Sequence, residues 1–138
     1  MSQLLVYVFS VVLSVCPMPP IQETGLATWY GAGNYHGDVR ADGQEFNPLE
    51  VGCAHRTIPL GTEIVVEAQD GAVLVCEVND RGPYWAIDDR GRGFVKTDLE
   101  APGEYRGPLD LSLGAARELF GVEGRPPNGI VNIRYWSK

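Results

Sequence analysis

The feature that most constrains the fold is an alternating apolar run that stops at residues unable to continue a strand. Residues 73–78 alternate as a strand with one buried face does. The run ends in Asn79-Asp80-Arg81-Gly82-Pro83, where Pro83 lacks a backbone N–H and Gly82 is free to adopt a positive φ. Asp80 therefore fits two roles: a proton-transferring carboxylate held by rigid backbone, or a cap of the turn.

Turn-forming residues are frequent throughout the chain. The 138 residues include 17 Gly and 10 Pro and are 44% hydrophobic, which indicates one mainly β domain of short strands joined by tight turns. The formal charge of −7 argues against a nucleic-acid-binding surface. No Cys-x-x-Cys or paired-His spacing occurs, so we expect no metal site, and the sequence indicates no cofactor.

The N-terminal residues resemble an export signal. Residues 4–15 are almost wholly apolar but too few to span a bilayer, which needs roughly 20 residues. We expect a signal over residues 1–16, with Cys16 either removed or lipidated, in which case it attaches the chain to a membrane. The alternative is a buried N-terminal strand. We expect a Pro-rich tether over residues 17–24, followed by a single domain over residues 25–138.

Two cysteines remain once Cys16 is set aside. In an oxidising compartment, Cys53 and Cys76 could pair and close a loop of about 24 residues, which contributes roughly 3 kcal/mol. The alternative is two free thiols buried in the core. We favour the disulfide.

The remaining pattern predicts several strands and one helix. The Asp-Gly pair at residues 70–71 predicts a hairpin before the central strand. The clearest helical segment covers residues 109–121, with Ser112 as N-cap and Gly121 after the last turn. Residues 85–108 indicate a solvated loop or, less simply, a loop that covers a substrate. The predicted strands cover residues 26–30, 51–55, 62–67, 73–78 and 129–136.

Aromatic residues lie near the predicted turns. Tyr30 and Tyr35 could stack on sugar rings through their faces, although core packing is the commoner fate of such residues, and Trp29 fits the core better. His55 ends the predicted strand before the hairpin, as Asp80 ends the strand after it. A lone histidine is more often structural, but this shared placement makes His55 a candidate site residue.

Together these segments resemble the rare lipoprotein A family of double-psi β-barrel domains. The resemblance implies a small six-stranded barrel with one or two short helices. It is carried by six motifs in the family's order: Ala27-Thr28-Trp29-Tyr30-Gly31, Tyr35-His36-Gly37, Ala41-Asp42-Gly43, the segment Ala54-His55-Arg56-Thr57-Ile58-Pro59-Leu60-Gly61-Thr62, Val78-Asn79-Asp80-Arg81-Gly82-Pro83-Tyr84, and Asp110-Leu111-Ser112 with Ala115-Ala116.

The resemblance also implies an activity. Members of this family are lytic transglycosylases that cut MurNAc–GlcNAc links in peptide-poor glycan strands and leave 1,6-anhydroMurNAc ends. By motif match, Asp80 is the acid/base and His55 orients or assists it. Substrate contacts are expected from Tyr30, Tyr35, Gln44, Asn79, Arg81 and Tyr84.

One position departs from the family pattern. Gln44 stands where related sequences carry a Glu after the Gly of Ala-x-Gly, and Glu45 follows it. Either Glu45 substitutes through a local shift, or Asp80 and His55 suffice, or catalysis is lost. Arg40 stands where Thr is usual.

Two further functions stay open. One is a non-catalytic, expansin-like module that binds wall polysaccharide, which Gln44 favours. The other is a hydrolase in which Asp80 and a second carboxylate, Glu45 or Asp42, activate water. For all three we expect a monomer exported to the cell envelope, with peptidoglycan glycan strands as the partner of the first.

Overall fold

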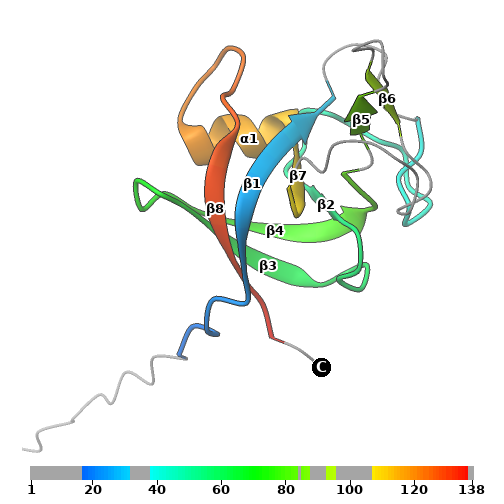
Figure 1. The fold of residues 1–138 in the computed structure, drawn as a ribbon. Helices are drawn as coiled ribbons and strands as arrows, with labels where there is room; N and C mark the ends of the chain where they lie inside the picture. The colour runs from blue at the N-terminus through cyan, green and yellow to red at the C-terminus, as the bar shows by residue number, and fades with distance from the viewer. Residues whose placement is uncertain (1–16, 32–37, 84, 88–92, 96–106, 137–138) are drawn as a thin grey trace, which may run out of the picture.

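The fold is a closed six-stranded β-barrel with one short helix. The computed structural model describes residues 17–31, 38–83, 85–87, 93–95 and 107–136. Figure 1 shows the elements in chain order: β1 (Glu23–Tyr30), β2 (Cys53–His55), β3 (Glu63–Ala68), β4 (Val73–Asp80), β5 (Trp85–Ile87), β6 (Gly93–Val95), β7 (Leu109–Ser112), α1 (Leu113–Phe120) and β8 (Gly129–Arg134). The barrel confirms the expected fold.

The strand order mixes parallel and antiparallel neighbours. Around the barrel the order is β1-β7-β2-β4-β3-β8, and β8 closes on β1. β1 pairs in parallel with β7, and β2 pairs in parallel with β4, whereas the other neighbours are antiparallel. Consequently, strands far apart in sequence lie side by side, and the ends of β1, β2 and β4 can supply residues to one site.

Alternation along the strands builds the core. On β4, residues 74, 76 and 78 are buried, while residues 73, 75 and 77 are exposed, as the sequence pattern predicts. The largest fully buried hydrophobic side chains are Ile64, Val66, Val78, Leu109, Leu111, Val131 and Ile133. Burying a side chain of this size contributes about 1.5–3 kcal/mol.

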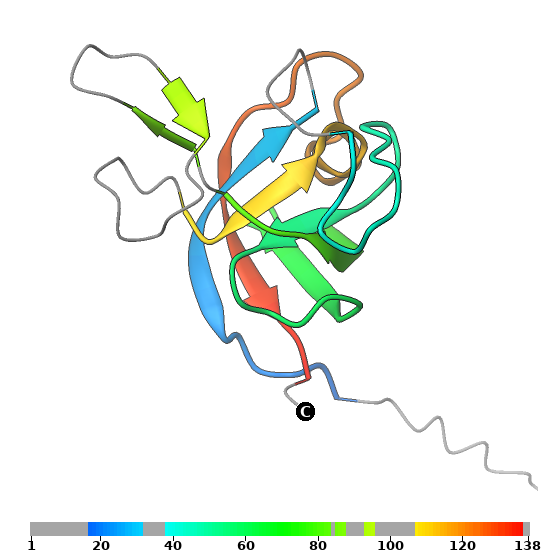
Figure 2. The ribbon, with the colours of Figure 1, turned by 90° about the vertical axis from the view of Figure 1, so that its right-hand side faces the viewer.

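The predicted caps of the helix, Ser112 and Gly121, are confirmed. The Ser112 hydroxyl accepts a hydrogen bond from the Ala115 N–H at 3.1 Å, and Gly121 adopts φ 65° after the last turn. The helix buries Ala115, Ala116 and Leu119 against the barrel, and Figure 2 shows it nearly end-on beside the tips of β1 and β7.

The prediction for residues 109–112 is wrong. We expected them to belong to the helical segment, but they form β7, a buried strand between β1 and β2. A four-residue strand that runs directly into a helix is too short for its period of two to show in the sequence. In the predicted loop over residues 85–108, β5 and β6 form a separate two-stranded antiparallel sheet.

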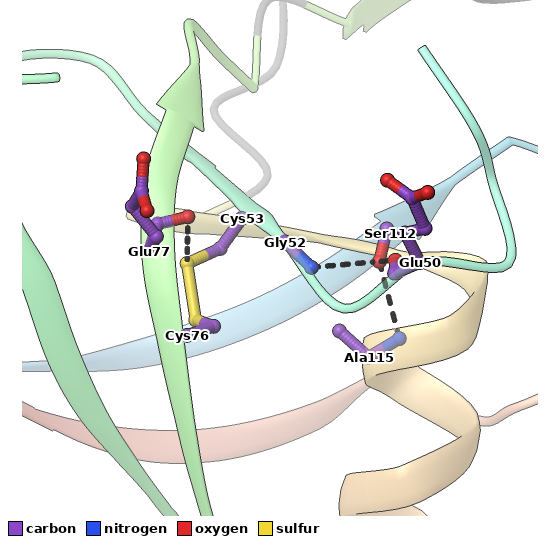
Figure 3. Close-up of a disulfide and its surroundings, with 7 residues drawn as sticks. All are labelled: Glu50, Gly52, Cys53, Cys76, Glu77, Ser112 and Ala115. Carbon is purple, nitrogen blue, oxygen red and sulfur yellow. Dashed lines mark hydrogen bonds between the residues drawn. A yellow bond between two sulfur atoms is a disulfide. The ribbon is translucent and has the colours of Figure 1, made fainter. Parts of the chain in front are cut away.

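The predicted disulfide is present. Cys53 of β2 and Cys76 of β4 are bonded, with their Cα atoms 6.2 Å apart and both side chains buried (Figure 3). The bond therefore joins two neighbouring strands next to the strand end that carries Asp80.

Residues 19–22, which precede the predicted domain start at Gly25, contact the barrel. Residues 19–22 lie along the end of β8, where the Arg134 guanidinium donates to the Pro19 carbonyl at 3.0 Å and the Gln22 N–H donates to the Ile133 carbonyl at 3.0 Å. No helix in the described ranges is long and apolar enough to cross a bilayer.

Candidate functional site

Asp80 lies at the end of β4, where the chain leaves the barrel. Its Oδ1 accepts hydrogen bonds from the backbone N–H groups of Ala41 and Arg81, each at 2.9 Å. The predicted turn follows, because Gly82 adopts φ 146°, a conformation that side chains rarely permit. Asp80 therefore does cap the turn, as one of the two predicted roles requires.

The second carboxylate oxygen of Asp80, Oδ2, accepts no backbone hydrogen bond within the described residues. With two N–H groups pointing at Oδ1, a proton on the carboxyl group has to reside on Oδ2. The Tyr30 hydroxyl lies 3.4 Å from Oδ2, which is long for a hydrogen bond between oxygens. Oδ1 thus makes the predicted cap, and the role of Asp80 in proton transfer stays a prediction.

Tyr30, at the end of β1, is held by a stacked aromatic neighbour. The centroids of the Tyr30 and Phe46 rings lie 5.0 Å apart, and the two ring planes make an angle of 17°. Burial raises the pKa of the Tyr30 hydroxyl, and the negative charge of Asp80 raises it further. Tyr30 thus stays a neutral hydroxyl beside Asp80, and one face of its ring is not free for a sugar.

His55 ends β2, and both of its ring nitrogens are occupied. Nδ1 accepts from the backbone N–H groups of Thr57 at 3.1 Å and Ile58 at 3.0 Å, and Nε2 lies 2.8 Å from a carboxylate oxygen of Glu23. Because Nδ1 accepts twice, the ring proton resides on Nε2 and is donated to Glu23. His55 is paired with Glu23, not with Asp80.

Arg81 connects these two residues through the backbone. Its guanidinium donates to the carbonyls of His55 at 3.1 Å and Ile58 at 2.6 Å. The expected substrate contact of Arg81 therefore has to compete with two internal hydrogen bonds, and the turn after β2 is tied to the residue after Asp80.

Residues 38–46 form a small hairpin against Asp80. Val39 and Glu45 form an isolated bridge, and Arg40 pairs with Asp42 through two hydrogen bonds of 3.0 and 2.8 Å. These bonds lower the pKa of Asp42 and raise that of Arg40. The hairpin holds the Ala41 N–H toward Asp80.

Gln44 and Glu45 both lie exposed on this hairpin. The Gln44 backbone N–H donates to Asp42, but neither side chain makes a hydrogen bond or ion pair within the described residues. Tyr35 and Tyr84 lie outside the described residues. Trp29 donates its indole N–H to the Pro126 carbonyl at 2.9 Å, so it is held by the barrel.

The sequence did not point to Phe46 or to the Ala41 amide. Phe46 belongs to no motif, and a backbone N–H that reaches a carboxylate has no sequence signal. No cluster of His, Cys, Asp and Glu side chains that could hold a metal ion occurs among the described residues.

The site can be compared with known proteins. A family model described as lytic transglycolase matches residues 22–135. The chain is 36% identical over 110 residues to the probable endolytic peptidoglycan transglycosylase RlpA of Synechocystis sp., covering 79% of this chain and 27% of that protein. It is 38% identical over 96 residues to the Aquifex aeolicus protein of the same name, covering 69% and 34%.

A third relative is the endolytic peptidoglycan transglycosylase RlpA of Pseudomonas aeruginosa, which is 29% identical over 119 residues, covering 83% of this chain and 29% of that protein. The chain thus spans about a quarter to a third of the length of these relatives.

Fold and site together define a small double-psi β-barrel with one carboxylate held at a strand end. The chain belongs to the lytic transglycolase family and is similar to a part of these RlpA proteins.

Proposed function

We propose that this domain is an endolytic peptidoglycan lytic transglycosylase that acts in the cell envelope. The observation that carries the proposal is the division of labour in Asp80, whose Oδ1 is held by two backbone N–H groups while Oδ2 remains for proton transfer. The family match and the names of the relatives supply the reaction class.

The proposed reaction needs one group that first gives and then takes a proton. Protonated Asp80 donates from Oδ2 to the glycosidic oxygen as the bond from that oxygen to the MurNAc anomeric carbon breaks. The carboxylate then takes the proton of the MurNAc 6-hydroxyl, whose oxygen attacks the anomeric carbon. The products are a 1,6-anhydroMurNAc end and a GlcNAc end, no water is consumed, and Asp80 is protonated again.

In this proposal His55 is a positioning residue, which holds the turn that contacts Arg81. Its ring fixes residues 57–58, and the carbonyls of residues 55 and 58 receive the Arg81 guanidinium beside Asp80. Gln44 and Glu45 lie on the hairpin whose Ala41 amide binds Asp80, so either side chain can contact a glycan at this rim.

The experiment is product analysis on peptide-free glycan strands by mass spectrometry. We expect 1,6-anhydroMurNAc ends with the wild type and their loss, by about 10²-fold or more, with Asp80→Asn. Asn retains an oxygen that can accept both N–H groups, so the melting temperature should change little. Reducing MurNAc ends would instead establish the hydrolase. Because Asp42 is paired with Arg40, Glu45 is then the better second carboxylate.

The second candidate is a non-catalytic wall-binding module. It is favoured by Gln44 and by the lack of any carboxylate in contact with Asp80 among the described hydrogen bonds and ion pairs. In that case, glycan strands are retained by wild type and Asp80→Asn alike and no product forms. Export, lipidation of Cys16 and the monomeric state remain part of the proposal, tested by membrane fractionation and by solution mass.

A further inference from the structure

The turns that follow β2 and β4 are joined by an arginine from each side. The guanidinium of Arg81, after β4, donates to two carbonyls of the turn after β2. Arg56, in the turn after β2, donates in return to the Pro83 carbonyl at 2.9 Å. The backbone N–H of Arg81 also binds Oδ1 of Asp80. The turn after β2 therefore helps to fix the orientation of the Asp80 carboxylate.

The imidazole of His55 holds that turn in shape. Its Nδ1 accepts the backbone N–H groups of Thr57 and Ile58, and the residue is only 6% exposed, so water has little access to replace these bonds. A proton on Nδ1 would point at both donors, whereas a proton on Nε2 leaves Nδ1 as an acceptor. The shape of the turn therefore depends on the tautomer of His55.

Glu23 is placed to fix this tautomer. It is the first residue of β1, and its carboxylate oxygen lies 2.8 Å from Nε2 of His55. β7 begins at Leu109, which pairs with Ala27 on β1 and with His55 on β2. Glu23 precedes Ala27 and therefore lies beyond the start of β7, where the His55 ring reaches it. An ionised carboxylate can only accept, so this contact requires the ring proton on Nε2.

We propose that Glu23 is a positioning residue for the reaction at Asp80. By accepting the Nε2 proton, Glu23 keeps Nδ1 of His55 unprotonated, and the turn after β2 keeps its shape. The carbonyls of that turn then hold Arg81, whose N–H holds Oδ1 of Asp80 and leaves Oδ2 directed at the substrate. The reaction named here rests on the proposed function, whereas the tautomer rests on the contacts alone.

Nitrogen NMR of the labelled whole chain tests the tautomer. The His55 ring resonances, identified by their loss in His55→Asn, should show a protonated Nε2 and an unprotonated Nδ1 in the wild type. Glu23→Ala should populate the tautomer protonated on Nδ1 and shift the backbone amide resonance of Arg81. Glu23→Gln keeps an oxygen that can accept, so it should resemble the wild type. Glu63→Ala, at the exposed start of β3, is the matched control and should change neither.

Kinetics test the effect on Asp80. Glu23→Ala should lower kcat for release of anhydro ends about 10-fold with KM little changed, because a small displacement of a catalytic group slows the chemical step. Glu23→Gln should restore kcat to within about 3-fold of the wild type. In His55→Asn the side-chain oxygen takes the place of Nδ1 and no ring proton remains, so adding Glu23→Ala should cause no further loss.

Three results would overturn the role of Glu23. They are a wild-type His55 ring protonated on Nδ1, an unchanged tautomer in Glu23→Ala, and an equal loss of kcat from Glu23→Ala with and without His55→Asn. If the wild type releases no anhydro ends, only the transglycosylase fails, because the ring resonances of His55 and the amide resonance of Arg81 still support or overturn the role of Glu23.

Discussion

The Tyr30 hydroxyl lies 3.4 Å from Oδ2 of Asp80, although the strands that carry these residues are not neighbours in the barrel. β7 and β2 lie between β1 and β4, and Tyr30 and Asp80 are the last residues of β1 and β4, so the contact is made at the strand ends. Tyr30 can donate to the ionised carboxylate and accept from the protonated one. It is thus a partner for both states that the proposed reaction needs.

Tyr30→Phe tests this partnership. Phe retains the ring stacked on Phe46 and removes only the hydroxyl, so we expect kcat for release of anhydro ends to fall about 3- to 10-fold with KM little changed, as for one weak hydrogen bond. Tyr135→Phe, at the end of β8, should behave as wild type. A rise in KM with unchanged kcat would show instead that Tyr30 acts in sugar binding.

His55→Ala should act mainly on stability. Truncation leaves the Thr57 and Ile58 N–H groups without their acceptor and removes the contact with Glu23. We expect a loss of about 2–3 kcal/mol in the free energy of unfolding, measured by urea denaturation. Glu23→Gln keeps an acceptor for the Nε2 proton and should cost less than about 1 kcal/mol. An unchanged unfolding free energy in His55→Ala, together with lost activity, would assign His55 a direct part in the chemistry.

Replacing both Cys53 and Cys76 with Ala should lower the free energy of unfolding by about 3 kcal/mol. The two residues are 23 positions apart, and without the disulfide the loop between them no longer restricts the unfolded chain. The oxidised wild type should unfold at higher denaturant concentration than the reduced wild type, and the double variant should be insensitive to reductant. Identical midpoints for oxidised and reduced wild type would contradict this expectation.

The Arg40–Asp42 pair predicts a small dependence of stability on pH. Hydrogen bonds from Arg40 lower the pKa of Asp42 from its ordinary value of 3.8. The stabilisation is therefore present above that value and is lost as the pH falls through the lower folded value. The pair is partly exposed, which limits its contribution to about 1 kcal/mol or less. The wild type should exceed Asp42→Asn in stability at about pH 7, and the gap should narrow as the pH falls below 3.8. A gap independent of pH would refute this.

The sequence predicted the helix caps and the placement of Asp80 at a strand end from local signals, the disulfide from the two cysteines left once Cys16 is set aside, and the barrel from the resemblance to a known family. Alternation identified the face that Leu74, Cys76 and Val78 bury, and Ser112 and Gly121 marked the ends of α1. These features depend on residues close together in the chain.

The features that the sequence missed depend on distant partners. β7 is a strand because β1 and β2 lie on either side of it, not because of its own pattern. The bulge at Asn79, a buried residue with no partner on β2, arises from the register between β2 and β4. The ring nitrogens of His55 are occupied by residues 57–58 and by Glu23, a residue outside every motif.

The contacts of residues 19–22 with β8 have a consequence for longer proteins built on this barrel. The chain enters at the start of β1, roughly 20 Å along that strand from Tyr30, and the end of β8 leaves beside the same point (Figure 1). Additional domains attached before or after the barrel would therefore extend from the base of β1 and not from the end of the strand that carries Tyr30. The barrel can thus work as an interchangeable unit within chains several times its own length.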